Sequence, residues 1–412
     1  MCIRDRQKIK QFDLERVKAE LEWTARHQSS AILIADANFG IFERDLEIAQ
    51  HIVSCNRRYG YPKMVAPTFA KNITDRVVDI VRLFRKAGIC SEALISIQTS
   101  DPQTLANIGR SNIKTVRYDE LLTRLRQENL PVSTDLMVGL PGQTVDSFKK
   151  DLQIYFDKDV RVQIWPTLVL ANSPMAERAY QEKFQMEVDA YGFVRSTISF
   201  TQEQRLEMLG IRTFFLVAEN FGYLRYVLRY LQWDHGIAAT DFLHELWLNY
   251  SQYPALSKFL ELLRPDETFN SGEESAEVSH YFSGPFRDNV SLRPDDFYIQ
   301  VEEFIHSHFK IPRSSGLAVV LRANQAVMPD PNQVYPLELQ LDHDIATYFA
   351  DGMQSQQKPL HSYPGCLLTV DDPDRLSSRD LSSPPPRGHA VRELDWELPS
   401  QLSNIRWAPV AS

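Results

Sequence analysis

Polar or glycine-containing turns follow five short apolar stretches in the first half of the chain. If those stretches are parallel strands, their carboxyl ends meet at one edge of a sheet, where α/β proteins bind ligands. The sequence therefore predicts one shared site for a polar ligand, with ordinary turn and cap residues as the alternative. The five turns are DANFG at 36–40, AKN at 70–72, SIQTS at 96–100, GLPGQ at 139–143 and LANSP at 170–174.

The side chains of the first and third turns suit different parts of a charged ligand. Asn38, together with backbone carbonyls, can hold an ammonium group, and Asp36 either reaches into the site or caps the next helix. Ser96 and Gln98 alternate onto one face of their strand and could bond ribose hydroxyls. Arg110 follows a short helix and could pair with a carboxylate through two hydrogen bonds.

The fourth strand adds a carboxylate and two glycines. Asp135 lies in mid-strand, where an inward-facing acid is costly unless it is paired or bound to a ligand. Gly139 and Gly142 would let the backbone approach a flat base or a sugar closely.

Strands and helices must alternate to position these turns, and the sequence has that pattern over about residues 10–185. Wholly apolar stretches are typical of strands buried on both faces, and amphipathic stretches separate them. We therefore expect a parallel sheet with right-handed crossovers. The expected strands are 31–35, 64–69, 93–98, 132–138 and 162–170, and the expected helices are 12–27, 43–58, one capped by Thr74, one starting at Asp101-Pro102, 118–129 and 145–156.

The pattern changes after about residue 200. We expect a long aromatic-rich helix at 201–233, helices at 240–265 and 297–309, and a half-buried strand at 334–341. The resulting division is a leader at 1–9, the strand–helix part at 10–200, a mostly helical region with a short strand at 201–350 and a poorly ordered Pro- and Ser-rich tail at 351–412.

Composition narrows the class of protein. The net charge is −9, which argues against a general nucleic-acid binder, although a local basic patch is compatible with it. No apolar run has the roughly 20 residues that span a bilayer, so we expect a cytoplasmic protein without a membrane partner. The four cysteines, Cys2, Cys55, Cys90 and Cys366, are too widely spaced for a zinc or iron–sulfur pattern.

Three segments together resemble the radical S-adenosylmethionine (SAM) superfamily. SIQTSDPQTLANIGR at 96–110 resembles its fourth-strand segment, and DLMVGLPGQTVDSF at 135–148 resembles its fifth-strand segment. ILIADANFGIF at 32–42 stands where that family places its second-strand motif. The segments ADANFG, AKN and LANSPMA resemble those of the subgroup that has an N-terminal cobalamin-binding domain.

The resemblance implies a fold and a ligand. The fold would be α/β, a partial (β/α)6 barrel of the radical SAM type lacking its first strand, followed by the mostly helical region. SAM would bind with its methionine end on the second-strand motif, its ribose on the fourth strand, its carboxylate at the following arginine and its sugar and adenine beside the fifth and sixth strands. The residues carried over are, in that order, Asp36, Ala37, Asn38 and Phe39; Ser96 and Gln98; Arg110; and Asp135, Gly139 and Leu170 or its neighbour Val169.

The chain departs from the family at the iron–sulfur loop. The family's C-x-x-x-C-x-x-C triplet, whose thiolates hold a 4Fe–4S cluster, has no counterpart here. Residues 8–23 resemble the segment on the C-terminal side of that loop, and MCIRDR resembles a translated sequencing-adaptor leader, so we expect a truncated chain; a natural protein that lost the cluster is the alternative. The intact parent would use SAM, the cluster and cobalamin, take electrons from a flavodoxin or ferredoxin, and act on a small or unknown substrate. The fragment itself would be inactive.

Other interpretations remain open. The chain could bind SAM or a nucleotide without radical chemistry, or be an unrelated barrel hydrolase or lyase that uses Asp36 and Asp135. His306 and His308 splay apart on a helix, which favours a structural role over a metal site. Asp234 and His235 either cap a helix or reach the substrate.

The missing triplet makes the first prediction. Anaerobic reconstitution of this chain with iron and sulfide should give no reduced 4Fe–4S signal by electron paramagnetic resonance, because three thiolates at the required spacing are absent. A cluster signal accompanied by SAM turnover would overturn it.

Overall fold

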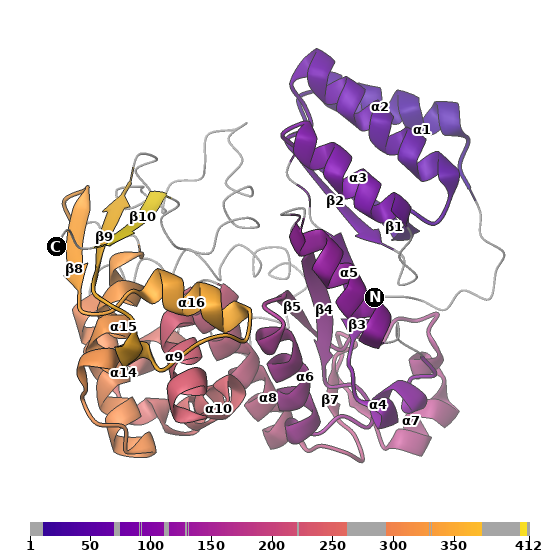
Figure 1. Ribbon diagram of the computed structural model, residues 1–412. Coiled ribbons are helices and arrows are strands. Elements are labelled where there is room, and N and C mark those ends of the chain that lie inside the picture. The colour runs from indigo at the N-terminus through magenta and orange to yellow at the C-terminus, as the bar shows by residue number, and fades with distance from the viewer. Residues whose placement is uncertain are drawn as a thin grey trace. The chain divides into compact units, whose positions relative to one another are not determined.

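The computed structural model forms two units (Figure 1). The first contains residues 1–205 and 385–397, and the second contains residues 206–384 and 398–412. The structure describes residues 11–69, 75–89, 91, 93–110, 115–127, 130, 132–220, 222–261, 294–328, 330, 332–372 and 404–409. The leader, Cys2, Cys90, Thr74 and the AKN turn at 70–72 lie outside these residues.

The first unit contains a five-stranded parallel sheet in the order β1-β2-β3-β4-β5. Its strands are β1 (Ala31–Phe39), β2 (Met64–Phe69), β3 (Ala93–Gln98), β4 (Val132–Val138) and β5 (Arg161–Pro166). The α/β class and the parallel sheet are therefore confirmed. That these strands are the second to sixth of a six-stranded barrel remains a prediction.

Two strands differ from the expected bounds. β1 continues through Asp36–Phe39, which we expected as a turn, because Phe39 pairs with Phe69 of β2 after a register shift. β5 ends at Pro166 and not at residue 170. Beyond it the chain turns to a new partner, since Leu168 bridges Phe193 in antiparallel fashion and Val169 N–H donates to the Gly192 carbonyl.

The sheet is least continuous in its middle. β2 and β3 share one paired position, Thr68 with Leu94. By contrast, β4 and β5 are paired at six positions, from Ser133–Arg161 to Val138–Pro166. In Figure 1 β1 and β2 lie with α1, α2 and α3, whereas β3, β4 and β5 lie with α5 and α6.

The helices of this unit bury the apolar faces that the sequence predicts. On α3, Val77, Val81 and Phe84 are buried, and on α6 Phe148 and Leu152 are buried. The helices are α1 (Leu14–Arg26), α2 (Glu43–Tyr59), α3 (Asp75–Lys86), α4 (Pro102–Asn107), α5 (Thr115–Gln127), α6 (Val145–Asp157) and α7 (Arg178–Phe184), with the 3-10 turn η1 (Pro174–Ala176) and the hairpin β6 (Glu187–Val188) and β7 (Val194–Ser196).

The second unit is mostly helical, as expected, but its long first helix is interrupted. α8 (Gln202–Phe215) ends in a π-helical turn at Leu216–Asn220, and α9 starts at Arg225. The buried Asn324 fixes this break, because its side-chain amide donates to the carbonyls of Gly222 and Tyr223 and its oxygen accepts from the Tyr226 N–H. The other helices are α9 (Arg225–His235), α10 (Ala239–Asn249), α11 (Pro254–Glu261), α14 (Pro294–Phe309), α15 (Ser315–Ala326) and α16 (Ile345–Met353).

A three-stranded antiparallel sheet completes this unit. β9 (Cys366–Asp371) lies between β8 (Leu337–Leu341) and β10 (Asn404–Pro409). β9 and β10 fall within the region expected to be a poorly ordered tail. Val370 and Leu368 of β9 are buried, and this burial gives the segment a place in the core that its composition did not indicate.

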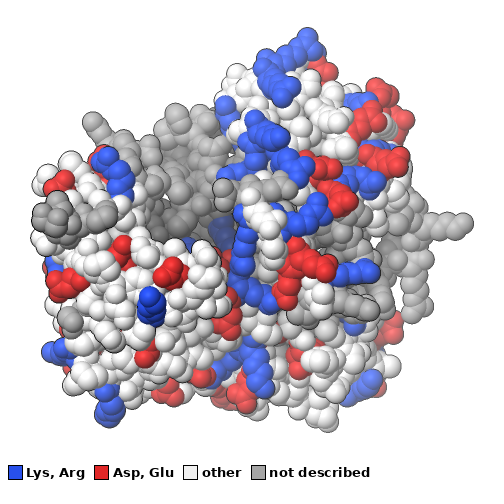
Figure 2. All heavy atoms as spheres, viewed as in Figure 1, with Lys and Arg blue, Asp and Glu red and all other residues white. Residues whose placement is uncertain are grey.

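Basic and acidic side chains are interleaved on the surface in view (Figure 2). Arg82 pairs with Asp79 on α3 at 2.6 Å, and Arg124 of α5 pairs with Asp75 of α3. Charges of both signs therefore lie side by side on this face. The expectation of no general nucleic-acid binding remains a prediction.

Gly40 generates a prediction about the packing of α3 against β1. A Cβ there would lie 2.7 Å from Val77 Cγ2, and φ is +90°. Gly60, the C-cap of α2, has φ +77° with nothing within 4 Å. We expect Gly60→Ala to cost about 1 kcal/mol, from backbone strain alone, and Gly40→Ala to cost about 2–4 kcal/mol because overpacking is added. Urea unfolding of both variants measures the difference, and equal losses would contradict the steric argument.

Candidate functional site

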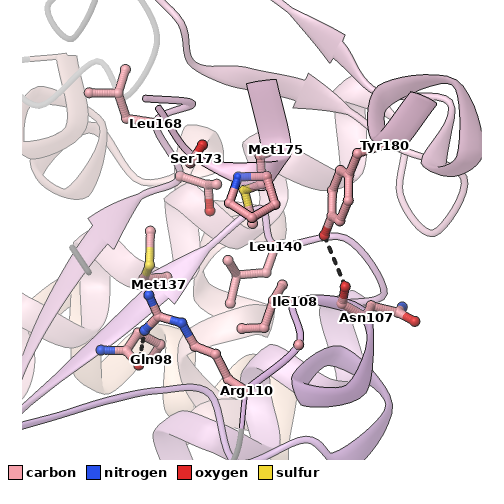
Figure 3. A pocket seen from close by; sticks show the side chains of 13 residues that line it. Gln98, Asn107, Ile108, Arg110, Met137, Leu140, Leu168, Ser173, Met175 and Tyr180 are labelled. Carbon is pink, nitrogen blue, oxygen red and sulfur yellow. Dashed lines mark hydrogen bonds between the residues drawn. The ribbon is translucent and has the colours of Figure 1, made fainter. Parts of the chain in front are cut away.

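A pocket of about 200 Å³ lies at the carboxyl ends of β3, β4 and β5 (Figure 3). Most of its lining is apolar, and Arg110 and Gln98 supply the strongest polar groups. This is the mixture typical of small-molecule sites, in which a few polar groups orient a ligand. The lining residues are Gln98, Asn107, Ile108, Gly109, Arg110, Met137, Leu140, Thr167, Leu168, Ser173, Pro174, Met175 and Tyr180.

Arg110 and Gln98 hold each other at one side of the pocket. Arg110 Nη1 donates to Gln98 Oε1 at 2.7 Å, and Figure 3 shows the two side chains meeting there. Gln98 is buried and has φ +69°, a left-handed conformation that is costly for a residue with a Cβ. Such strain is typical of functional sites, where the surrounding structure imposes it.

Helix α4 brings Arg110 back to the strand end. Asp101 caps this helix by accepting from the Thr104 N–H at 2.7 Å, and Pro102 starts it, as the sequence predicts. Gly109, with φ +61°, then reverses the chain so that Arg110 faces Gln98.

Gln143 fixes the loop after β4. Its Oε1 accepts from the N–H groups of Gly139 at 2.7 Å and Leu140 at 3.3 Å, and its Nε2 donates to the Met137 carbonyl at 3.0 Å. The side chain is fully buried, so these bonds satisfy groups that water does not reach. Gly139 and Gly142 have φ +88° and +100°, which explains glycine at both positions.

Tyr180 and Asn107 join the wall opposite Arg110. The Tyr180 hydroxyl donates to the Asn107 carbonyl at 3.0 Å, as drawn in Figure 3. Asn107 Nδ2 in turn donates to the Pro141 carbonyl at 3.2 Å. Burial raises the pKa of Tyr180 to about 12, so this hydroxyl stays a hydrogen-bond donor at neutral pH. The bonds link α7, α4 and the loop after β4.

Asp135 links three neighbouring strands beside the pocket. It accepts from Ser96 Oγ of β3 at 2.6 Å and from Trp165 Nε1 of β5 at 3.0 Å. The indole of Trp165 is 45% exposed, and Met137, paired with it across the strands, lines the pocket. The expected partner of the mid-strand acid is thus supplied by protein side chains, and each carboxylate oxygen keeps a second lone pair for a ligand.

The residues at the end of β1 lie apart from this pocket lining. Asp36 accepts from the Asn38 N–H at 2.9 Å, and both side chains are exposed. Phe39 is buried against Phe69, with ring centroids 6.2 Å apart, so its side chain serves the core. The side chain of Ala37 lies outside the described residues.

The sequence thus placed two residues in the pocket, Gln98 and Arg110. The remaining predicted residues, namely Asp36, Asn38, Phe39, Ser96, Asp135, Gly139 and Leu170, lie outside its lining. Whether they bind a ligand remains a prediction. The sequence analysis did not name Met175, although it lies in the LANSPMA segment, and it missed Tyr180, which carries no motif.

Two further candidates, Asp234 and His306, have structural partners. Asp234 accepts from the Tyr348 hydroxyl and from the Leu360 N–H, which ties α9 to α16. His306 contacts the Ile311 carbonyl through Nδ1. Among the residues that the structure describes, no group of three or more His, Cys, Asp or Glu could hold a metal ion.

The chain is similar in sequence to known proteins. The family model of the Radical SAM superfamily matches residues 1–154, which contain β1 to β4. This part of the chain is similar to that superfamily.

Two similar proteins are named methyltransferases. The cobalamin-dependent radical SAM methyltransferase TokK of Streptomyces tokunonensis is 28% identical over 86% of this chain and 59% of its own. The 2-(S-pantetheinyl)-carbapenam-3-carboxylate methyltransferase of Streptantibioticus cattleyicolor is 30% identical over 58% of this chain and 38% of its own. The chain therefore spans about three fifths and two fifths of these relatives.

A solved structure also matches, at a TM-score of 0.32 and 16% identity, covering 40% of this chain and 33% of the other. It is the radical SAM methyltransferase TsrM from Kitasatospora setae with cobalamin and a [4Fe–4S] cluster. Within the described residues, no helix has the length and apolar character needed to cross a membrane.

Gln143 generates the prediction for this site. Gln143→Leu should destabilise the fold by about 2–4 kcal/mol, because two buried N–H groups lose their acceptor. Gln143→Glu is the matched control, since it keeps the acceptor.

The stability of the control variant Gln143→Glu should also depend on pH. The introduced carboxyl can donate to the Met137 carbonyl only when protonated, so its folded-state pKa is raised. The stability of Gln143→Glu should then fall relative to the parent chain as pH rises. Urea unfolding from about pH 4, near the reference pKa of Glu, to about pH 8 checks this. A difference in stability between the two proteins that does not change with pH would contradict it.

Proposed function

We propose that the pocket binds SAM and that the chain is the SAM-binding part of a radical SAM enzyme, a cobalamin-dependent methyltransferase. The Arg110–Gln98 pair in the pocket carries this proposal. A guanidinium matches a carboxylate in shape and charge, and SAM has a carboxylate at its methionine end. The two relatives, both named methyltransferases, support methyl transfer as the reaction of the parent protein.

The chain's residues fit SAM in parts. A cavity of about 200 Å³ is smaller than the roughly 300–1,000 Å³ of whole-ligand sites. It would therefore hold one portion of SAM. Arg110 would bind the carboxylate, the apolar side chains of Met137, Leu140 and Leu168 would exclude water, and Ser96 with Asp135 would accept or donate bonds to ribose hydroxyls.

The described residues do not fit an iron–sulfur cluster. Cys55 and Cys366 are both buried, one in α2 of the first unit and the other in β9 of the second. The cluster and cobalamin are thus proposed only for the longer parent, together with its reductant, a flavodoxin or ferredoxin. A protein that binds SAM without radical chemistry is the second candidate.

Calorimetry with two ligands tests the proposal. SAM should bind the full chain, and Arg110→Met should weaken SAM binding about 10- to 100-fold, the effect of losing a charged hydrogen bond. Binding of 5′-methylthioadenosine, which lacks the amino-acid carboxylate, should be unchanged.

Lys150→Met is the matched control, because it removes an exposed positive charge on α6 outside the pocket. It should alter neither affinity. Absence of SAM binding, or equal losses for both ligands in Arg110→Met, would refute the assignment.

A further inference from the structure

Residues 98–110, the β3–α4 segment, form a closed loop at the edge of the pocket. The segment starts at Gln98 in its left-handed conformation and ends at Arg110, whose guanidinium bonds back to Gln98. Both of its ends line the pocket. The position of the guanidinium therefore depends on how the first residues of the segment are held.

Asp151, in the middle of α6, holds those first residues. Its Oδ2 accepts from Thr99 Oγ1 at 2.6 Å and its Oδ1 accepts from the Ser100 N–H at 2.7 Å. The side chain is only 2% exposed, and both donors are neutral. Burying a carboxylate with only neutral partners lowers the stability of the fold relative to an apolar side chain. A carboxylate at this position is therefore a candidate for a functional role.

The bonds continue from Asp151 into α4. Thr99 Oγ1 also accepts from the Asp101 N–H at 3.1 Å, and Asp101 caps α4. Ser100 Oγ lies 3.2 Å from the Tyr155 hydroxyl, one turn along α6 from Asp151. A continuous set of hydrogen bonds thus runs from α6 through residues 99–101 to α4, the helix that precedes Arg110.

We propose that Asp151 is a positioning residue of the pocket: its carboxylate seats residues 99–101 and thereby places the Arg110 guanidinium for a ligand carboxylate. Asp151 lies outside the pocket lining and acts through the β3–α4 segment. The identity of the ligand rests on the proposed function, whereas the seating of the segment does not.

The ionisation of the Asp151 carboxyl makes this role testable by changing the pH. Burial raises the pKa of Asp151 to about 6, and nearby Asp101 adds to the increase, while the bonds from Thr99 and Ser100 oppose it. Tyr155 on α6 and Tyr118 on α5 also face this region, and burial raises the pKa of each, so neither changes charge near pH 6. Asp119 on α5 is engaged by Lys158.

The signs of the two pH effects differ. Protonation of Asp151 removes one acceptor site, so carboxylate binding at Arg110 should weaken as pH falls through about 6. Because the folded pKa lies above the unfolded value of about 3.9, the contribution of this carboxyl to stability is present at low pH and is lost as pH rises from about 4 to about 6. A purely structural role would show the second effect alone.

The experiment follows SAM affinity from pH 5 to pH 8, a range that includes the pKa of about 6, in the full chain and in Asp151→Asn. The parent chain should lose about tenfold in affinity below pH 6, and the variant should have a weaker, flat profile. Thr99→Val, which removes one donor to the carboxylate, should move the midpoint to higher pH. Asp146→Asn, an exposed acid on the same helix, is the control and should keep the parent profile.

Hydrogen exchange of the peptide containing residues 99–110 gives a readout that needs no ligand. The Ser100 amide should exchange faster in Asp151→Asn than in the parent chain at neutral pH, after correction for intrinsic rates. SAM binding with the same pH profile in both proteins would overturn the positioning role and leave the proposed function intact. Absence of SAM binding would overturn the proposed function, and unchanged exchange in Asp151→Asn would then overturn the inference as well.

Discussion

The first unit depends on one constraint: a loop that leaves the end of a buried strand carries N–H groups that need acceptors. Three buried side chains meet this need. Asp45 accepts from the N–H groups of Gly40 and Phe42 after β1. Asp151 accepts from Ser100 after β3, and Gln143 accepts from Gly139 and Leu140 after β4. Each acceptor lies on a helix or immediately before one. The conformation of each loop therefore depends on how the neighbouring helix packs.

This constraint explains why the pocket is where it is. Asp151 of α6 holds the loop after β3, and Gln143 holds the loop after β4. Tyr180, from the segment after β5, bonds to Asn107 at the opposite wall of the pocket. Side chains that face the opening are then free to be mostly apolar, and the Arg110 guanidinium lies among them. Burial raises the pKa of Asp45 and that of Asp151, because desolvation disfavours the charged form of each carboxyl.

The similarity to the radical SAM superfamily covers only part of the pocket. The match covers residues 1–154, and the pocket includes residues from beyond it, such as Thr167 and Tyr180. The shared motifs thus shape one side of the pocket, and the part after β5 supplies the other.

The sequence by itself determined the elements and the edge of the sheet that carries the site. Strands β2, β3 and β4 have the predicted bounds, because continuous apolar stretches bounded by turn residues leave little choice of period or length. It also placed Gln98 and Arg110, since a motif fixes their spacing across α4. The tertiary structure alone decided that β1 extends to Phe39, which gains a partner in Phe69, and that Asp135 bonds Ser96 and Trp165. It alone revealed Asp151, 52 positions from the hydroxyl that it accepts, because a hydrogen bond between distant elements leaves no periodic trace in a sequence.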